Sequence, residues 1–185
     1  MLARPFVLCL VSSAITCVIA APTTPTDADP SSSTDSEFPE VIPGPGMPSL
    51  ESLGLTTADL YRNSTLKALS ANHVELLITC EKGGLTVSQS SAQACVNYLT
   101  SLGTTDCMVP ANGLSRFCSS GNANIWGTNV WGNGQDVHSW CSDVGITAQD
   151  IVSGCVITSG QVEGYGPAAQ NSNLQVSVEA YDTVC

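Results

Sequence analysis

Apolar side chains repeat at helical spacing in the segment that follows residue 89. Five of them lie three or four positions apart, as on one face of an α-helix: Ala92, Cys95, Val96, Leu99 and Leu102. Thr86 and Gln89 stand before them at the spacing of a capping box, and Gly103 supplies a stop after them. The pattern predicts an amphipathic helix that ends at Gly103.

A β-hairpin is predicted around the dipeptide Asn112-Gly113. Residues 107–110 and 115–118 form its two arms, and Asn-Gly is a strong signal for a two-residue turn. In this hairpin Cys107 faces Cys118 within disulfide distance. We therefore expect a bridge between them, although spacing alone leaves other pairings open.

The chain after this hairpin is expected to run as a strand through residues 121–127 and later to form two helices. One helical face is marked by four residues: Val137, Trp140, Cys141 and Val144. For this reason we expect Trp140 to lie in the core. Gly145 is expected to interrupt the helix, and Thr147 with Asp150 indicates the N-cap of a third helix.

Strict alternation marks the last element. Four apolar residues alternate with Gln175, Ser177 and Glu179, which is typical of a half-buried antiparallel strand: Leu174, Val176, Val178 and Ala180. The resulting order is α-β-β-α-α-β. It predicts a small α+β sandwich, stabilised by disulfides, whose helices pack on one face of an antiparallel sheet.

Residues 1–20 have the organisation of a secretory signal peptide. A positive charge at Arg4 precedes an apolar run over residues 6–19, and Val18 and Ala20 stand three and one positions before a cleavage site. The run is short for a membrane span of about 20 residues, and no stop-transfer charges follow it. We expect the signal to be cleaved and the mature protein to be exported, without insertion into a membrane.

Residues 21–71 are predicted to form a disordered acidic tail before a folded domain at residues 72–185. Residues 21–50 hold seven of the ten prolines, the polar run at residues 31–34 and several acidic residues, and they contain no basic residue. Such a segment buries too little apolar surface to offset the entropy of ordering it. A weak helix is expected near residues 57–69, and Asn63 begins the only N-glycosylation sequon.

The amino-acid composition argues against nucleic acids and anionic membranes as partners. Hydrophobic residues make up 43% of the chain and charged residues 11%, and the formal net charge is -11. Phosphate binding requires Lys and Arg, and only 5 are present against 16 Asp and Glu. Nucleic acids and anionic membranes are therefore not expected as partners.

The cysteine count agrees with export. Seven of the nine cysteines follow the signal peptide: Cys80, Cys95, Cys107, Cys118, Cys141, Cys155 and Cys185. We expect three disulfides among the first six, with Cys185 as the odd thiol. Neither a metal site nor a cofactor is expected, because the chain has no CxxC pair and its only histidines are His73 and His138.

The sequence carries no recognisable catalytic motif. It has no GxSxG elbow, and His138 is expected on the exposed side of a helix, where it has a structural role. The carboxylates that a glycosidase would need are interpreted first as helix-start or surface residues. We therefore predict that the protein is not an enzyme.

The composition of two loops favours a sugar ligand. Sugars have apolar faces and dense hydroxyl groups, which aromatic rings and amide side chains bind. Six candidate ligand-binding residues lie in segments 119–134 and 165–173: Trp131, Trp126, Tyr165, Asn124, Asn129 and Asn171. Gly and Asn also favour turns for backbone reasons, and Trp126 fits the core equally well. Trp131 is the preferred candidate, because it stands in a polar loop without periodic partners.

Three segments of the chain resemble a known family: "FCSSGNANIWGTN", "HSWCSDVGITAQDIVSGC" and "VEGYGPAAQNSNLQVSV". They are similar to small secreted fungal proteins with a Y-three-type glycan-binding domain, over roughly residues 80–180. The resemblance implies an α-β-β-α-α-β fold in a secreted, lectin-like module. Members of that family often have Gly-Gly before the Asn-rich loop. This chain has Gly164-Tyr165-Gly166-Pro167, which would reshape a pocket there.

The resulting hypothesis is a secreted, non-catalytic protein that binds glycans or glycoproteins. A weaker resemblance, to killer-toxin and necrosis-inducing effector domains, rests on the same disulfide-bonded α+β pattern. The alternative is therefore a secreted effector or killer-toxin-like protein that acts on another cell. An inert component of a cell wall or matrix is a third interpretation.

Overall fold

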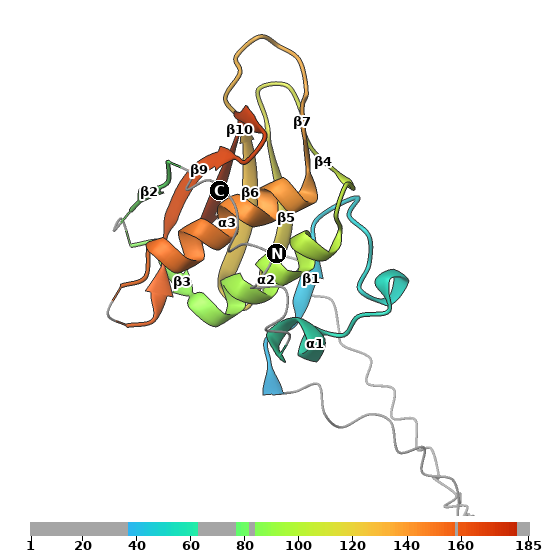
Figure 1. The fold of residues 1–185 in the computed structure, drawn as a ribbon, viewed down its shortest axis with the longest axis vertical. Helices are drawn as coiled ribbons and strands as arrows, with labels where there is room; N and C mark the ends of the chain where they lie inside the picture. The colour runs from blue at the N-terminus through green and yellow to red at the C-terminus, as the bar shows by residue number, and fades with distance from the viewer. Residues whose placement is uncertain (1–36, 63–76, 82–83, 158, 181–185) are drawn as a thin grey trace, which may run out of the picture. The chain divides into compact units, whose positions relative to one another are not determined.

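The computed structural model (Figure 1) describes four segments of the chain: residues 37–62, 77–81, 84–157 and 159–180. Several predictions lie outside the described residues. They concern the signal peptide, the start of the tail, Asn63, His73 and Cys185. Within the described segments, no helix is long and apolar enough to cross a membrane.

A six-stranded antiparallel sheet is the centre of the fold, in the strand order β1-β5-β6-β10-β9-β2. Its strands are β1 (Val41–Pro43), β2 (Thr79–Cys80), β5 (Leu114–Ser120), β6 (Ala123–Asn129), β9 (Gly164–Ala168) and β10 (Asn171–Glu179). Two short antiparallel pairs stand beside it: β3 (Val87–Ser88) with β8 (Gln161–Val162), and β4 (Asp106–Val109) with β7 (Val137–Trp140).

Two long helices lie side by side over one face of the sheet, α2 (Gln89–Ser101) and α3 (Cys141–Gly154) (Figure 1). Large buried side chains fill the layer between helices and sheet: Tyr98, Leu99, Phe117, Ile125, Ile151 and Leu174. The expected class, a small α+β fold with an antiparallel sheet, is confirmed. The helix predicted before Gly103 is also confirmed, and the apolar residues of β10 are buried as its alternation predicted.

Helix α3 continues through Gly145, where the sequence predicted a break between two helices. A Cβ atom added to Gly145 would lie 2.8 Å from Oγ1 and 3.1 Å from the backbone N of Thr100 in α2. The glycine therefore permits a close approach of the two helices. The residues before Cys141 form β7 rather than a helix, so the element order differs from α-β-β-α-α-β.

A turn is present one residue earlier than predicted, with Ala111-Asn112 rather than Asn112-Gly113 at its centre, and the strands beside it do not pair with each other. Gly113 N donates to Pro110 O at 3.0 Å, and Asn112 has a φ of 53°. Strand β4 pairs instead with β7, and β5 pairs with β6. The sequence predicted continuous strand after β5, whereas Gly121, with a φ of 53°, reverses the chain between β5 and β6.

Three disulfides join the six cysteines for which pairing was predicted: Cys80–Cys155, Cys95–Cys118 and Cys107–Cys141. The expected Cys107–Cys118 bridge is wrong, because β4 and β5 are not hydrogen-bonded partners. Cys118 instead links β5 to α2, and Cys107 links β4 to the start of α3. Small disulfide-rich domains are typical of oxidising compartments, which is consistent with an extracellular protein.

Residues 37–62 pack onto the domain, although the sequence predicted a disordered tail up to residue 71. Strand β1 pairs with β5 at the sheet edge, and Val41 is only 2% exposed. Pro43 ends this short edge strand, where the missing N–H of proline is tolerated. The proline-rich composition therefore gave no indication of strand β1, which pairs with β5 and covers that edge of the sheet.

Helix α1 (Thr57–Arg62) follows a 3-10 turn at Glu51–Leu53 and matches the start of the weak helix predicted near residues 57–69. Thr56 caps it, because Thr56 Oγ1 accepts from Asp59 N while Thr56 N donates to the Asp59 carboxylate. Leu60 is buried, and its carbonyl accepts a hydrogen bond from Asn97 Nδ2 at 2.6 Å. These contacts anchor the helix to α2.

Candidate functional site

A pocket of about 620 Å³ lies beside the β4–β7 pair, next to the first turn of α3 and the turn between β9 and β10. We call it the β7 pocket. Eight residues line it: Thr104, Asp106, His138, Ser139, Trp140, Asp143, Gln170 and Asn171. Its volume is within the range of roughly 300–1,000 Å³ that is typical of small-molecule sites.

Trp140 gives the β7 pocket an aromatic surface. The residue is 55% exposed, which corrects the prediction that it lies in the core. That prediction assumed a helical period, but β7 alternates with period two, so Val137 is buried while His138 and Trp140 point outward. Trp140 is also the N-cap residue of α3, at the point where strand changes to helix.

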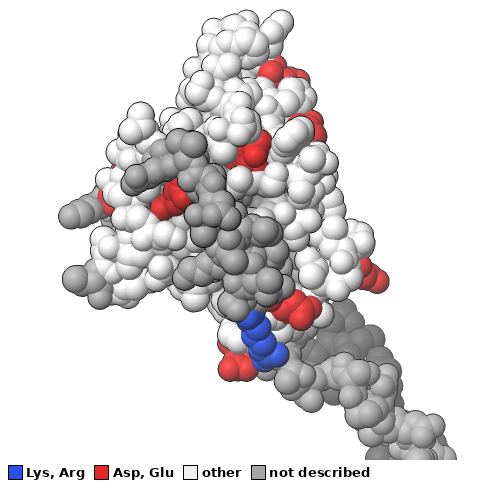
Figure 2. Space-filling model, in the orientation of Figure 1, with Lys and Arg blue, Asp and Glu red and all other residues white. Residues whose placement is uncertain are grey.

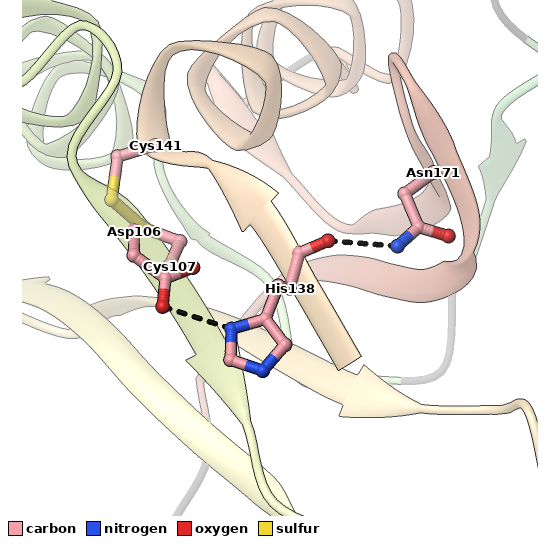
Figure 3. Close-up of polar contacts among 5 residues, drawn as sticks. All are labelled: Asp106, Cys107, His138, Cys141 and Asn171. Atoms are coloured by element: carbon pink, nitrogen blue, oxygen red, sulfur yellow. Dashed lines mark hydrogen bonds and ion pairs between the residues drawn. A yellow bond between two sulfur atoms is a disulfide. The ribbon is translucent and has the colours of Figure 1, made fainter. Parts of the chain in front are cut away.

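Asp106 and His138 come from neighbouring strands and contact each other through their side chains (Figure 3). His138 Nδ1 lies 2.9 Å from Asp106 Oδ2, so the carboxylate orients the imidazole. The His138 carbonyl accepts a hydrogen bond from Asn171 Nδ2 at 2.8 Å, which joins β7 to the start of β10. Each of the two strands and the β9–β10 turn thus places polar groups at the β7 pocket.

Asp143 is buried in the first turn of α3 and is only 7% exposed. Desolvation raises the pKa of its carboxyl above the ordinary value of 3.8. Within the described part of the chain, the carboxylate accepts no hydrogen bond, although its backbone carbonyl accepts one from Thr147 Oγ1. The oxygens of this carboxylate are not among the fully buried polar atoms without a partner, so they are accessible from the β7 pocket.

Asp106 and His138 form part of the arrangement that nucleophilic hydrolases use. A His-Asp pair serves hydrolysis when a nucleophile is hydrogen-bonded to the second ring nitrogen. Among the described residues, no hydroxyl or thiol makes that contact with His138. The same residues contain no group of three or more side chains that could hold a metal ion.

Of the six candidates from the sequence, only Asn171 lines the β7 pocket. Trp131 is 46% exposed in the loop between β6 and β7, and its backbone N–H donates to Asn129 Oδ1. The Asn129 amide also donates to the carbonyls of Pro110 and Gln135, so its polar groups shape the loop.

The remaining candidates lie in separate places on the sheet. Trp126 is half-buried in β6 with the Arg116 guanidinium over its ring, and both line a hollow of about 390 Å³. Tyr165 of β9 lines a hollow of about 140 Å³. Asn124 is half-buried in β6, opposite Glu179 of β10. The structure therefore does not bring the predicted residues together at one site.

Sequence reasoning missed Asp106, His138, Trp140 and Asp143 as members of a site. The segment Val137 to Trp140 gives no strand signal, because its residue types do not alternate and only their burial in β7 does. Cys141 and Val144 continue the apolar spacing into α3, which favours a helical period for the whole segment. No local sequence pattern predicts the pairing of β4 with β7, which brings Asp106 to His138.

Comparison with known proteins gives one match. A family described as a domain of unknown function, DUF8794, matches residues 77–180, which is more than half of the chain. No curated protein and no solved structure matches significantly.

Proposed function

The chain belongs to the DUF8794 family, a domain of unknown function, and we propose that it is a secreted, non-catalytic protein that binds glycans. The β7 pocket is the proposed binding site. The resemblance to Y-three-type domains supports the class of ligand, and three disulfides in a small domain support an extracellular location.

The observation that carries the proposal is the exposed ring of Trp140 beside a pocket lined with amide, hydroxyl and carboxylate groups. A sugar stacks its C–H face on an aromatic ring and exchanges hydrogen bonds with such groups at the ring's edge. Gln170 and Asn171 contribute amide groups to the lining of the β7 pocket, and Asp106 contributes a carboxylate acceptor.

A glycan array probed with the secreted protein tests the function, and titration calorimetry with the best ligand tests the site. Trp140→Ala is expected to weaken binding about tenfold, which is the scale of a lost aromatic stack. Trp131→Ala is the matched control, because Trp131 is similarly exposed but does not line the β7 pocket. Both variants should fold, since neither ring is buried.

Two outcomes would contradict the proposal. If Trp131→Ala rather than Trp140→Ala weakens binding, the sugar site is the loop between β6 and β7, as the sequence predicted. If the protein binds nothing on a broad array, the proposal of a glycan-binding protein fails. The effector or toxin-like alternative would then be tested by growth and necrosis assays.

A further inference from the structure

Asp143 places a carboxylate in the β7 pocket to which the described part of the protein donates no hydrogen bond. The residue lines the pocket and is 7% exposed. Its oxygens are not among the fully buried polar atoms without a partner, so they reach the space of the pocket. A donor on a bound ligand can therefore form a hydrogen bond with this carboxylate without displacing a protein partner.

The charged residues of the β7 pocket favour a ligand with a positive charge. Asp106 and Asp143 are both carboxylates, and His138 is the one ionisable base among the described lining residues. Figure 2 shows acidic groups scattered over the face it views, with a single basic patch near its lower end. An acidic or sulfated sugar would be repelled here, whereas a cationic group would be attracted.

Trp140 adds a second preference for a cation. Its ring is exposed at the pocket, and the face of an indole attracts an ammonium group more strongly than other aromatic side chains do. An ammonium group also has three N–H donors, which suits a site with an unpartnered carboxylate and a neighbouring second one. An acetylated nitrogen has a single donor and no charge. It therefore interacts less favourably than an ammonium group with both the indole ring and the two carboxylates.

We propose that the β7 pocket selects glycans that carry an unacetylated amino sugar, with the ammonium group bound at Asp143 and Asp106 beside Trp140. This inference rests on the proposed glycan-binding function and adds the class of sugar. Asp143 determines the selectivity because no donor among the described residues occupies its carboxylate, and a charge-assisted hydrogen bond to an ammonium group is stronger than one to a neutral donor.

The test compares three β-1,4-linked oligosaccharides of equal length by titration calorimetry with the full-length secreted protein. They consist of glucosamine, N-acetylglucosamine and glucose. We expect the glucosamine oligomer to bind at least tenfold more tightly than the other two. Asp143→Asn should lower its affinity about tenfold, towards that of the acetylated oligomer, because a charge-assisted hydrogen bond is lost.

Glu51→Gln is the matched control for net charge. It also removes one negative charge, but Glu51 lies in the exposed 3-10 turn and does not line the β7 pocket. If this variant weakens binding as much as Asp143→Asn does, the attraction is non-specific and the inference fails. Asp106→Asn provides a second test of the pocket if Asp143→Asn does not fold.

The failure of the inference is distinguishable from the failure of the proposed function. The ammonium preference is overturned if the three oligomers bind with equal affinity. It is also overturned if the neutral oligomers bind more tightly and Trp140→Ala weakens that binding. In both cases the proposal of glycan binding remains valid. The absence of binding to all three, together with a silent glycan array, would overturn both.

Discussion

Cys107 and Cys141 are joined by a disulfide with their Cα atoms 5.0 Å apart, and each directly follows a residue of the β7 pocket. Asp106 precedes Cys107, Trp140 precedes Cys141, and Asp106 and Trp140 are partners in the register of β4 and β7. The covalent link therefore holds together the two strand ends that present a carboxylate and an aromatic ring to the pocket.

Removing this disulfide should affect both stability and binding. The double variant Cys107→Ser, Cys141→Ser is expected to lower the free energy of unfolding by about 2–4 kcal/mol, as measured by urea denaturation. Glycan affinity should also fall under conditions where the variant is still folded, because Asp106 and Trp140 are no longer held in register.

The Cys80–Cys155 disulfide is the control for this effect. It joins β2 to the residue that follows α3 and does not line the β7 pocket. Replacing both of its cysteines with Ser should reduce stability by a similar amount and leave the affinity of the folded protein unchanged. Equal losses of affinity in the two double variants would show that the Cys107–Cys141 bridge has no special role at the pocket.

Gly145→Ala should destabilise the packing of α2 on α3. The added methyl group would lie 2.8 Å from Thr100 Oγ1 and 3.1 Å from the Thr100 backbone, so the helices must separate. We expect a loss of about 1–3 kcal/mol from overpacking, reduced by about 1 kcal/mol because alanine favours the helix. Urea denaturation measures the difference.

Gly154→Ala is the matched control within the same helix. Its added methyl group would meet only the Ile78 Cδ1 atom, at 2.9 Å, and the end of that flexible side chain can move. This variant should be as stable as the parent protein or slightly more stable. The proposed role of Gly145 is refuted if Gly145→Ala behaves in the same way.

Limited proteolysis should leave a resistant fragment that begins before Val41. Residues 37–62 are held by the β1–β5 pairing and by the hydrogen bond from the Tyr98 hydroxyl to Pro48 O at 2.6 Å. Gly44→Ala should loosen this segment, because its Cβ would lie 1.7 Å from Arg116 O, and the cleavage sites should then shift towards residue 62. A wild-type fragment beginning after residue 62 would contradict the packing described here.

Ionisation of Asp143 should lower stability. Its folded-state pKa is raised by desolvation, so its favourable contribution is complete below the ordinary pKa of 3.8 and is lost as pH rises through the folded-state pKa. The stability of Asp143→Asn relative to the wild type should therefore increase over this pH window and then level off. Urea denaturation across the acid range tests this, with Glu51→Gln as control, and a pH-independent difference contradicts it.

Local sequence patterns predict only some of the residues at the candidate site. Loop composition predicts Asn171 as a ligand-binding residue, and Asn171 lines the β7 pocket. Four apolar residues match a helical period and predict Trp140 in the core, but they span a strand–helix junction. The sequence predicts His138 as an exposed residue, but its partner Asp106 lies 32 positions away in the chain, where no local pattern connects the two.

The sequence by itself determined the features that depend on near neighbours. These are the helix that ends before Gly103, a turn that includes Asn112, the burial of the apolar residues in the last strand, and the six cysteines that form disulfides. Each follows from periodicity, backbone preference or cysteine count within a short window.

Only the tertiary structure decided which strands pair, which cysteines bond and which tryptophan is exposed at a pocket. Strand β4 has the same local pattern whether its partner is β5 or β7, and Gly145 has the same local effect whether it ends a helix or allows two helices to meet. These choices depend on burial and hydrogen bonding between segments far apart in the chain. The free energy of pairing two strands depends on both strands and on the core that they bury together, so neither segment determines it alone.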